Sequence, residues 1–143
     1  MNLSELNPDI ALKSLLDGKV KVGSDARIIE VYAQGMQPNT GLGADFITII
    51  YNGAVSSWTN PIGQFNGNLA LMITCKMNSN GTIKQPRMSK IVAQCEKLIN
   101  RKRSQGFFFS LDRDNVITPP IPNYTTGYAT TALNVAWHTA YNS

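Results

Sequence analysis

The sequence predicts an α+β fold, in which one long amphipathic helix packs on a face of a mainly antiparallel sheet and a short helix precedes it. Three observations lead to this prediction. Several segments are rich in β-branched and aromatic residues, as strands are. Residues 86–100 carry an apolar stripe at helical spacing. Short, turn-like segments connect most of the strands. The length of 143 residues suits a single domain, residues 1–143.

The first predicted helix begins at Asn7-Pro8 and ends at Gly18. An Asn side chain accepts free N–H groups at a helix start, Pro fits the first turn, and Gly is typical of a helix end. Its apolar stripe consists of Ala11, Leu12, Leu15 and Leu16. Two strands are predicted next, RIIEVYA from Arg27 and DFITIIYN from Asp45.

The middle of the chain holds the clearest periodic patterns. NGAVSSW and TNPIGQFNGN, residues 52–68, indicate a hairpin or a flexible extension. NLALMITCKM alternates as a strand does, and NSNG then makes a turn. The apolar stripe of the amphipathic helix consists of Met88, Ile91, Val92, Cys95, Leu98 and Ile99. GFFFSL, residues 106–111, is predicted to be a short strand.

The C-terminal third is predicted to contain a turn, an extended segment and a long strand. DRDN, with Asp112 and Asp114, is a turn, and VIT pairs with the chain that follows. PPIP, residues 119–122, is expected to be exposed and extended, because proline donates no ladder hydrogen bond. The last strand covers about residues 128–141.

His138, the single histidine, is the first candidate for a catalytic residue. In the last strand it alternates with Trp137, so the two side chains lie on opposite faces. A general base needs an orienting partner and a nucleophile within reach, and a metal site needs further ligands. We interpret His138 as an ordinary strand residue. Cys75 and Cys95 lie on core-facing stripes, so we expect buried, reduced thiols.

The sequence contains no set of residues that indicates an enzyme. Gly41-Leu42-Gly43 lacks the third glycine of a dinucleotide motif and precedes a strand, so we interpret it as a turn. No phosphate-binding loop or paired-carboxylate motif is present. We expect no catalysis, no cofactor and no metal.

Charge is distributed unevenly along the chain. Residues 84–103 hold seven Lys and Arg against Glu96 alone, whereas the first 46 residues have six acids and four bases. The candidate subunit-interface or DNA-facing residues are Lys90, Lys97, Arg101, Lys102 and Arg103. Charged residues are only 15% of the chain, and a polar surface of low charge suits a protein surrounded by neighbours in an assembly.

RKRSQGFFFSL gives an alternative, a small nucleic-acid-binding module that uses the basic helix 84–103 and Phe107–Phe109. Basic residues followed by Gly and aromatics are similar to the RNA-binding motif of RRM domains, whose aromatics stack on bases. Phe108 stands where that motif has a small residue, and no helix is predicted after this strand. We therefore interpret the phenylalanines as packing residues and the basic run as a solvated helix C-terminus.

The order of the elements resembles that of the tail-completion or tail-terminator proteins of tailed bacteriophages, over about Ile10 to Thr139. The resemblance is carried by the N-terminal helix, the Arg27-Ile28-Ile29 stretch, DFITIIY, the strand-to-helix unit LALMITCK to IVAQCEKLIN, and GYATTALNVAWHT. It implies a structural virion protein that forms a ring, a hexamer, at the head-proximal end of the tail. Such a ring ends tube growth and docks the head, and its partners are the tail tube protein and the head–tail connector or neck proteins.

The NGAVSSWTNPIGQFNGN and PPIP regions depart from this pattern and leave open another ring of the neck. DNA would pass through the pore without sequence-specific binding, and we expect the basic helix to face an acidic neighbour instead. No window reaches the ~20 apolar residues that span a bilayer, and the N-terminus lacks signal-peptide features. We therefore expect no membrane contact, assembly in the host bacterial cytoplasm, and a final location in the virion neck.

Overall fold

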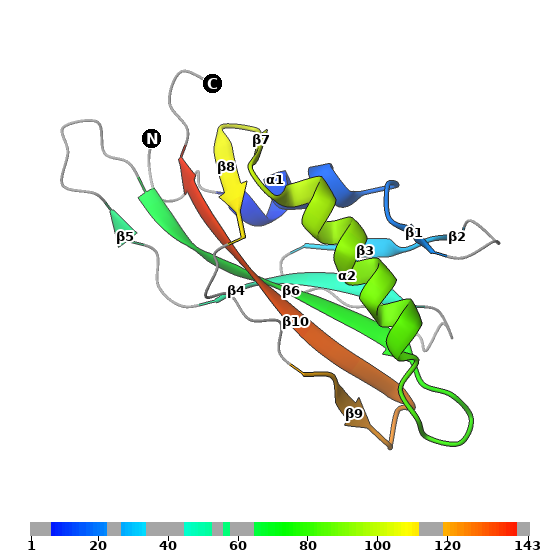
Figure 1. The fold of residues 1–143 in the computed structure, drawn as a ribbon. Coiled ribbons are helices and arrows are strands. Elements are labelled where there is room, and N and C mark those ends of the chain that lie inside the picture. Colours follow the sequence, from blue (N-terminus) through cyan, green and yellow to red (C-terminus); the bar gives the residue numbers. More distant parts are fainter. Residues whose placement is uncertain are drawn as a thin grey trace.

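The computed structural model describes residues 7–22, 27–33, 45–52, 56–57, 65–111 and 119–139. They form an α+β protein of two helices and a curled sheet, so the predicted class is confirmed (Figure 1). The elements are α1 (Pro8–Leu16), β1 (Lys21–Val22), β2 (Arg27–Ile28), β3 (Glu30–Tyr32), β4 (Phe46–Tyr51), β5 (Ser56–Ser57), β6 (Phe65–Lys76), α2 (Gln85–Ile99), β7 (Lys102–Ser104), β8 (Phe107–Ser110), β9 (Ile121–Asn123) and β10 (Tyr128–Thr139).

The main sheet has the strand order β3-β4-β6-β10-β8-β7, and β5 and β9 pair with β6 and β10. Its centre is the antiparallel pair of β6 and β10, which stays in register from Tyr128–Lys76 to His138–Asn66. One pairing departs from the predicted hairpin connections, because β3 and β4 are parallel. The connection between the two strands, residues 33–45, lies mostly outside the described residues.

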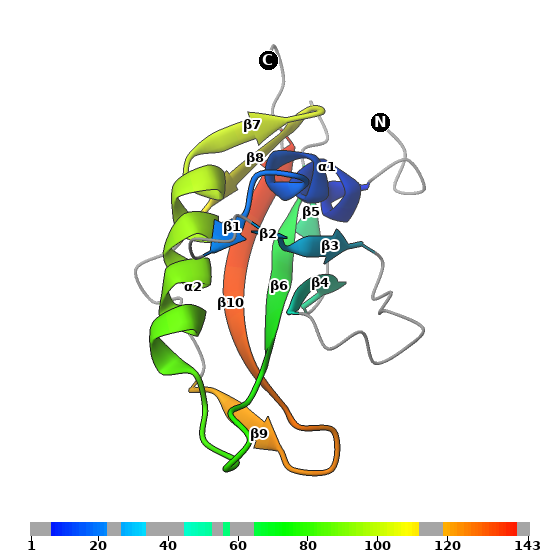
Figure 2. The same ribbon diagram turned by 90° about the vertical axis from the view of Figure 1, so that its right-hand side faces the viewer.

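The core lies between the sheet and the two helices, which contact each other on the same side of β6 and β10 (Figure 2). Alternate residues of β6 and β10 face it, as their periodicity predicts. From α2 the core receives Met88, Ile91, Val92, Cys95 and Ile99. Leu98 of the predicted stripe is only half-buried.

Both ends of α1 lie at the predicted residues, but its N-cap differs from the prediction. Asn7 makes no side-chain cap hydrogen bond, and its carbonyl instead accepts the N–H of Ala11 at 3.2 Å. At the other end, Gly18 has a φ of 74°. That left-handed conformation favours glycine, which explains why the helix ends there.

The predicted strand RIIEVYA is wrong in one respect, because it divides into two strands of different sheets. Arg27 and Ile28 pair with β1, and the strand β3 begins only at Glu30. Between them the N–H of Ile29 donates to the carbonyl of Val20 at 2.8 Å. Sequence periodicity does not show this change of partner, because both pieces are extended.

The basic run after α2 was predicted to be a solvated helix C-terminus, and this prediction is wrong. The helix ends at Ile99, Arg101 has a left-handed φ of 58°, and Lys102 and Arg103 lie in β7. A second reversal at Gln105 and Gly106, with φ of 50° and 85°, then leads into β8. Two tight turns therefore place the basic residues on an edge strand.

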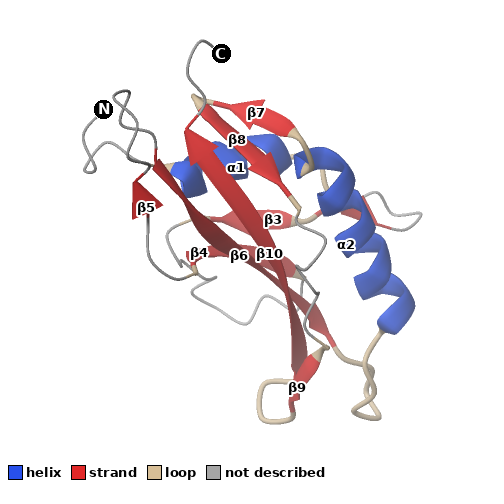
Figure 3. Cartoon of the chain, turned by 60° about the vertical axis from the view of Figure 1, so that its left-hand side comes forward, coloured by secondary structure: helices blue, strands red, loops and turns tan. Residues whose placement is uncertain are grey.

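PPIP is extended as predicted, but part of it pairs with the sheet. Residues Ile121–Asn123 form β9, which lies beside β10 (Figure 3). In this pair Pro122 is opposite Ala129. Proline is tolerated in an edge strand because one side of that strand needs no ladder hydrogen bond. Earlier in the chain, β5 pairs antiparallel with the start of β6, as the hairpin alternative predicts.

The predictions for Gly41–Gly43, for Asp112 and Asp114, and for residues 116–118 lie outside the described residues.

Candidate functional site

The five predicted basic residues are all exposed, but they do not form one surface. Lys90 and Lys97 project from α2, Arg101 lies in the turn after it, and Lys102 and Arg103 lie in β7. Of the five, Lys97 and Lys102 line the same hollow.

The two basic residues of β7 point to opposite sides of the sheet. Lys102 is paired with Phe109, which is buried in the core, so its side chain lies on the helix side. Arg103 is paired with Phe108 and lies on the other side, which we call the outer face. The outer face is the sheet surface that bears Phe108, Ala136 and His138.

A cleft of about 520 Å³ lies where α1, the second half of α2 and β7 meet. We call it the lysine cleft, and it is lined by Leu15, Lys19, Gln94, Lys97, Leu98 and Lys102. Figure 2 shows α1, the end of α2 and β7 together at this end of the molecule. Its apolar lining is half-buried leucine side chains, and its lysines are exposed.

Hydrogen bonds between neighbouring elements hold the walls of the lysine cleft in place. Gln94 of α2 accepts the N–H of Lys21 at 2.9 Å, and its amide group donates to the carbonyl of the same residue. The hydroxyls of Ser14 and Ser104 are 2.7 Å apart and join α1 to β7. The cleft is therefore bounded by elements that are tied together.

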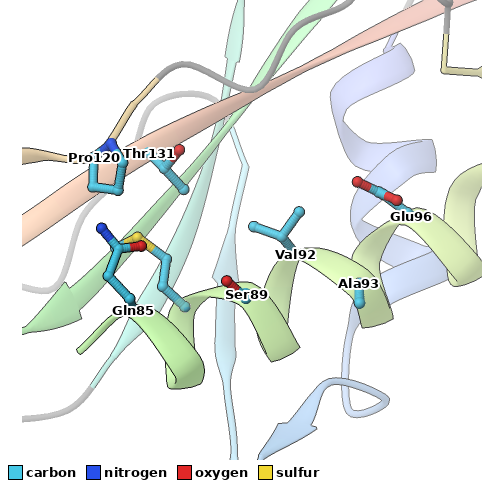
Figure 4. A pocket seen from close by; sticks show the side chains of 8 residues that line it. Gln85, Ser89, Val92, Ala93, Glu96, Pro120 and Thr131 are labelled. Atoms are coloured by element: carbon cyan, nitrogen blue, oxygen red, sulfur yellow. The ribbon is translucent and has the colours of Figure 1, made fainter. Parts of the chain in front are cut away.

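A second hollow of about 280 Å³ lies on another side of α2, between its residues 85–96 and the segment that leads to β9 (Figure 4). Its lining is Gln85, Met88, Ser89, Val92, Ala93, Glu96, Pro120 and Thr131. Among the described residues, Glu96 alone brings a charge to that lining. This hollow is therefore more apolar than the lysine cleft and has the opposite charge.

The three consecutive phenylalanines divide between the two faces of the sheet. Phe107 and Phe109 are buried in the core. The ring of Phe107 contacts both Phe109 and Trp137. Phe108 is half-buried on the outer face, with its ring centroid 5.0 Å from that of His138. His138 is thus a strand residue beside an aromatic ring, and its Nδ1 lies 3.0 Å from the carbonyl oxygen of Thr139.

Both cysteines are buried and free, as their positions on core-facing stripes predict. Burial raises the pKa of the Cys75 thiol to about 12, and nearby Asp45 adds to the increase. Burial likewise raises the pKa of Cys95 to about 12. A nucleophilic thiol requires a lowered pKa, so neither residue has the environment of a reactive cysteine.

A buried carboxylate at the start of α1 was not predicted from the sequence. Asp9 is 1% exposed, and the hydroxyl of Tyr51 donates to its Oδ1 at 3.1 Å. Burial, and then the neighbouring Asp9, raise the pKa of Tyr51 to about 12, so the phenol remains a donor. The pair joins the start of α1 to the end of β4. A carboxylate in the first turn of a helix is a weak signal for such a contact, since it also suits the helix dipole.

A second buried carboxylate joins β4, β6 and α2. Asp45 accepts the N–H of Lys76 at 2.9 Å and forms an ion pair with the Arg87 guanidinium. The Asp45 side chain is 6% exposed and the Arg87 side chain 29%. This contact fixes the start of α2 against the sheet, so Arg87 has a structural role.

No group of three or more His, Cys, Asp and Glu side chains that could hold a metal ion occurs in the described part of the chain. None of the helices described is long and apolar enough to cross a membrane.

Comparison with known proteins shows the fold and nothing finer. No family model matches the chain, and no curated protein matches it. Several solved structures match the chain, and one of them, of a protein without a descriptive name, is similar with a TM-score of 0.62 at 11% identity. The similarity covers 94% of each chain. At this identity the similarity extends to the fold alone, which the two chains share over nearly their whole length.

Proposed function

We propose that this protein is a structural subunit of a phage virion, a tail-terminator or neck ring. It assembles in the host cytoplasm, ends tube growth and docks the head. Its framework is a mainly antiparallel sheet with one long amphipathic helix on a face, and the subunit performs no catalysis. The partners are copies of itself, six in a ring, the tail tube protein, and the connector or neck proteins.

The observation that carries this proposal is the opposite charge of the two outermost strands in the order β3-β4-β6-β10-β8-β7. β7 presents exposed Lys102 and Arg103, whereas β3 presents exposed Glu30. A closed ring is built from contacts between two different surfaces of the same subunit. Pairing of β7 with β3 of the next copy joins opposite charges and satisfies the free backbone groups of both edge strands.

Charge exchange between the two edges tests this contact. Glu30→Arg and Arg103→Glu each place like charges at positions 30 and 103 of every interface. Because Lys102 stays in β7, either variant alone should form rings only at higher protein concentration than the wild type. An equal mixture of the two should assemble again. In an alternating ring, the two unchanged side chains meet at one interface and the two substituted ones meet at the next, so every interface joins an acid to a base. Lys76→Glu, the same kind of charge change at the exposed end of β6, is the control.

The measurement is mass in solution across protein concentrations, with and without purified tail tube. Rings in the mixture at the protein concentration where the wild type forms them, and in neither single variant at that concentration, support the proposal. Assembly of both single variants as in the wild type, or a wild type that stays monomeric even on the tube, overturns it.

A nucleic-acid-binding module is the second candidate, and one observation favours it. Arg103, Phe108 and His138 are neighbours across β7, β8 and β10 on the outer face. Basic and aromatic side chains together are typical of surfaces that bind single strands. This role uses Phe108 alone of the three phenylalanines, since the other two are buried. In this role the affinity of the protein for nucleic acid decreases steeply as the salt concentration rises. Ring assembly depends instead on protein concentration.

A further inference from the structure

We infer that the lysine cleft binds an acidic peptide segment of a partner protein, one that carries carboxylates beside at least one large apolar side chain. This site shares Lys102 of β7 with the proposed ring contact, whereas its other lining residues lie on α1, on α2 and directly after α1.

The charge of the lysine cleft selects an anion. Lys19, Lys97 and Lys102 contribute three ammonium groups, and no carboxylate of the described residues is part of the lining. In the described part of the chain these three lysines take part in neither of the two ion pairs, which are Lys13–Asp17 and Arg87–Asp45. Three ammonium groups around one hollow repel each other, and an anionic ligand removes that repulsion.

The apolar part of the lining selects a peptide over a simple anion. Leu15 of α1 and Leu98 of α2 are half-buried beside the core, and both line the cleft. An apolar side chain that covers them removes their remaining surface from water, which is favourable in proportion to the area covered. The volume of about 520 Å³ lies within the range of ~300–1,000 Å³ that ligand pockets have.

The same lining disfavours a nucleic acid. No aromatic side chain of the described residues lines the lysine cleft, so bases find no ring on which to stack. The half-buried Phe108 lies on the outer face of the sheet, away from the helices.

The walls of the lysine cleft are held in place before a ligand binds. The Gln94–Lys21 and Ser14–Ser104 hydrogen bonds hold its walls together without one. A hollow whose walls are already placed loses little conformational entropy on binding. The long stems of the lysines can move their charges to meet carboxylates at different positions. The site therefore suits an acidic, leucine-containing segment better than it suits a rigid small molecule.

The test uses the full chain and a fluorescently labelled peptide of Glu, Asp, Ser and Leu residues. Two matched peptides carry Gln and Asn in place of the acids, or Ser in place of the leucines. A single-stranded oligonucleotide of equal charge is the third probe. Fluorescence anisotropy gives each affinity, and NMR of the leucine methyl groups locates the contact.

We expect the acidic leucine peptide to bind best and to shift the methyl signals of Leu15 and Leu98. Lys19→Glu with Lys97→Glu should weaken binding by at least about tenfold, since two attractions become repulsions. Lys97→Glu alone should weaken binding by at least about threefold. Lys76→Glu makes the same single change of charge near the start of α2, at the other end of a helix about 20 Å long, and should leave the affinity within about twofold. An unchanged denaturation midpoint shows that each variant is folded.

Three outcomes overturn the inference. The first is weakening by Lys76→Glu that equals the weakening by Lys97→Glu alone, which indicates attraction by net charge alone. The second is equal binding of the peptide without leucines, and the third is tighter binding of the oligonucleotide through the same lysines. Failure of the Glu30 and Arg103 exchange does not affect this result, because neither residue lines the cleft.

Discussion

Gly67 of β6 is opposite Trp137 of β10, and the indole ring lies over the glycine so closely that a Cβ there would be 2.9 Å from Cζ2 of the ring. Trp137 is 2% exposed and contacts Phe107 edge-to-face, with ring centroids 5.6 Å apart. The strand thus has a glycine at this position because the largest side chain of the core occupies the space of its side chain.

Gly67→Ala should therefore destabilise the protein by about 1–3 kcal/mol, because a buried indole cannot move aside without disturbing its neighbours. Urea denaturation measures the loss. Combining the change with Trp137→Phe, which shortens the ring, should cost less than the sum of the two single changes. A strictly additive result would contradict the steric explanation.

The phenylalanines of β8 should differ in their contribution to stability. Phe109→Ala leaves a cavity at a position that is 0% exposed and should cost about 3–5 kcal/mol. Phe108→Ala, on the outer face, should cost clearly less, about 1–2 kcal/mol, because its ring is only half-buried. Denaturant unfolding of the two variants under the same conditions measures the loss of unfolding free energy in each. Equal losses would contradict the assignment of Phe108 and Phe109 to opposite faces of the sheet.

Loss of Arg87 should be costly because it leaves the Asp45 carboxylate nearly buried without its cation. Arg87→Met should destabilise by about 2–4 kcal/mol, between the values for exposed and fully buried pairs. Lys13→Met, in the exposed Lys13–Asp17 pair at 3.7 Å, is the matched control and should cost less than ~1 kcal/mol. Comparable losses in the two variants would show that the Asp45–Arg87 pair has no special role.

The two cysteines should react with iodoacetamide at pH 8 only after unfolding. A rise in thiol pKa from 9.0 to about 12 lowers the thiolate fraction at that pH about a thousandfold in the folded state. Mass spectrometry with and without urea measures the modification. Rapid labelling of the native protein would show that the thiols are accessible.

The same shifts predict how stability depends on pH. Below pH 9 the thiols are protonated in both the folded and the unfolded chain and contribute no pH dependence. Between pH 9 and about 12 only the unfolded chain loses these protons, so stability decreases as pH rises. Urea midpoints at pH 8 and pH 10 should differ more in the wild type than in a Cys75→Ala, Cys95→Ala variant. Equal differences would attribute the effect to other groups.

Several elements could be predicted from the sequence because their signals are local. The alternation in β6 and β10 and the apolar stripe of α2 depend only on residues a few positions apart, and both correspond to buried faces. The same is true of Gly18, whose conformational freedom ends α1. The charges of Lys97 and Lys102 were also evident, but their position in a cleft was not.

The tertiary structure alone decided which of these pieces meet. Composition and periodicity are properties of short segments, so they predict an α+β chain, the apolar stripe of α2, the alternating strands and a cluster of basic residues. Folding placed Lys19, which follows α1, in one cleft with Lys97, divided RIIEVYA at Ile29, and brought Arg103 to a sheet edge. Strand partners and converging side chains depend on contacts between distant residues, which no local pattern contains.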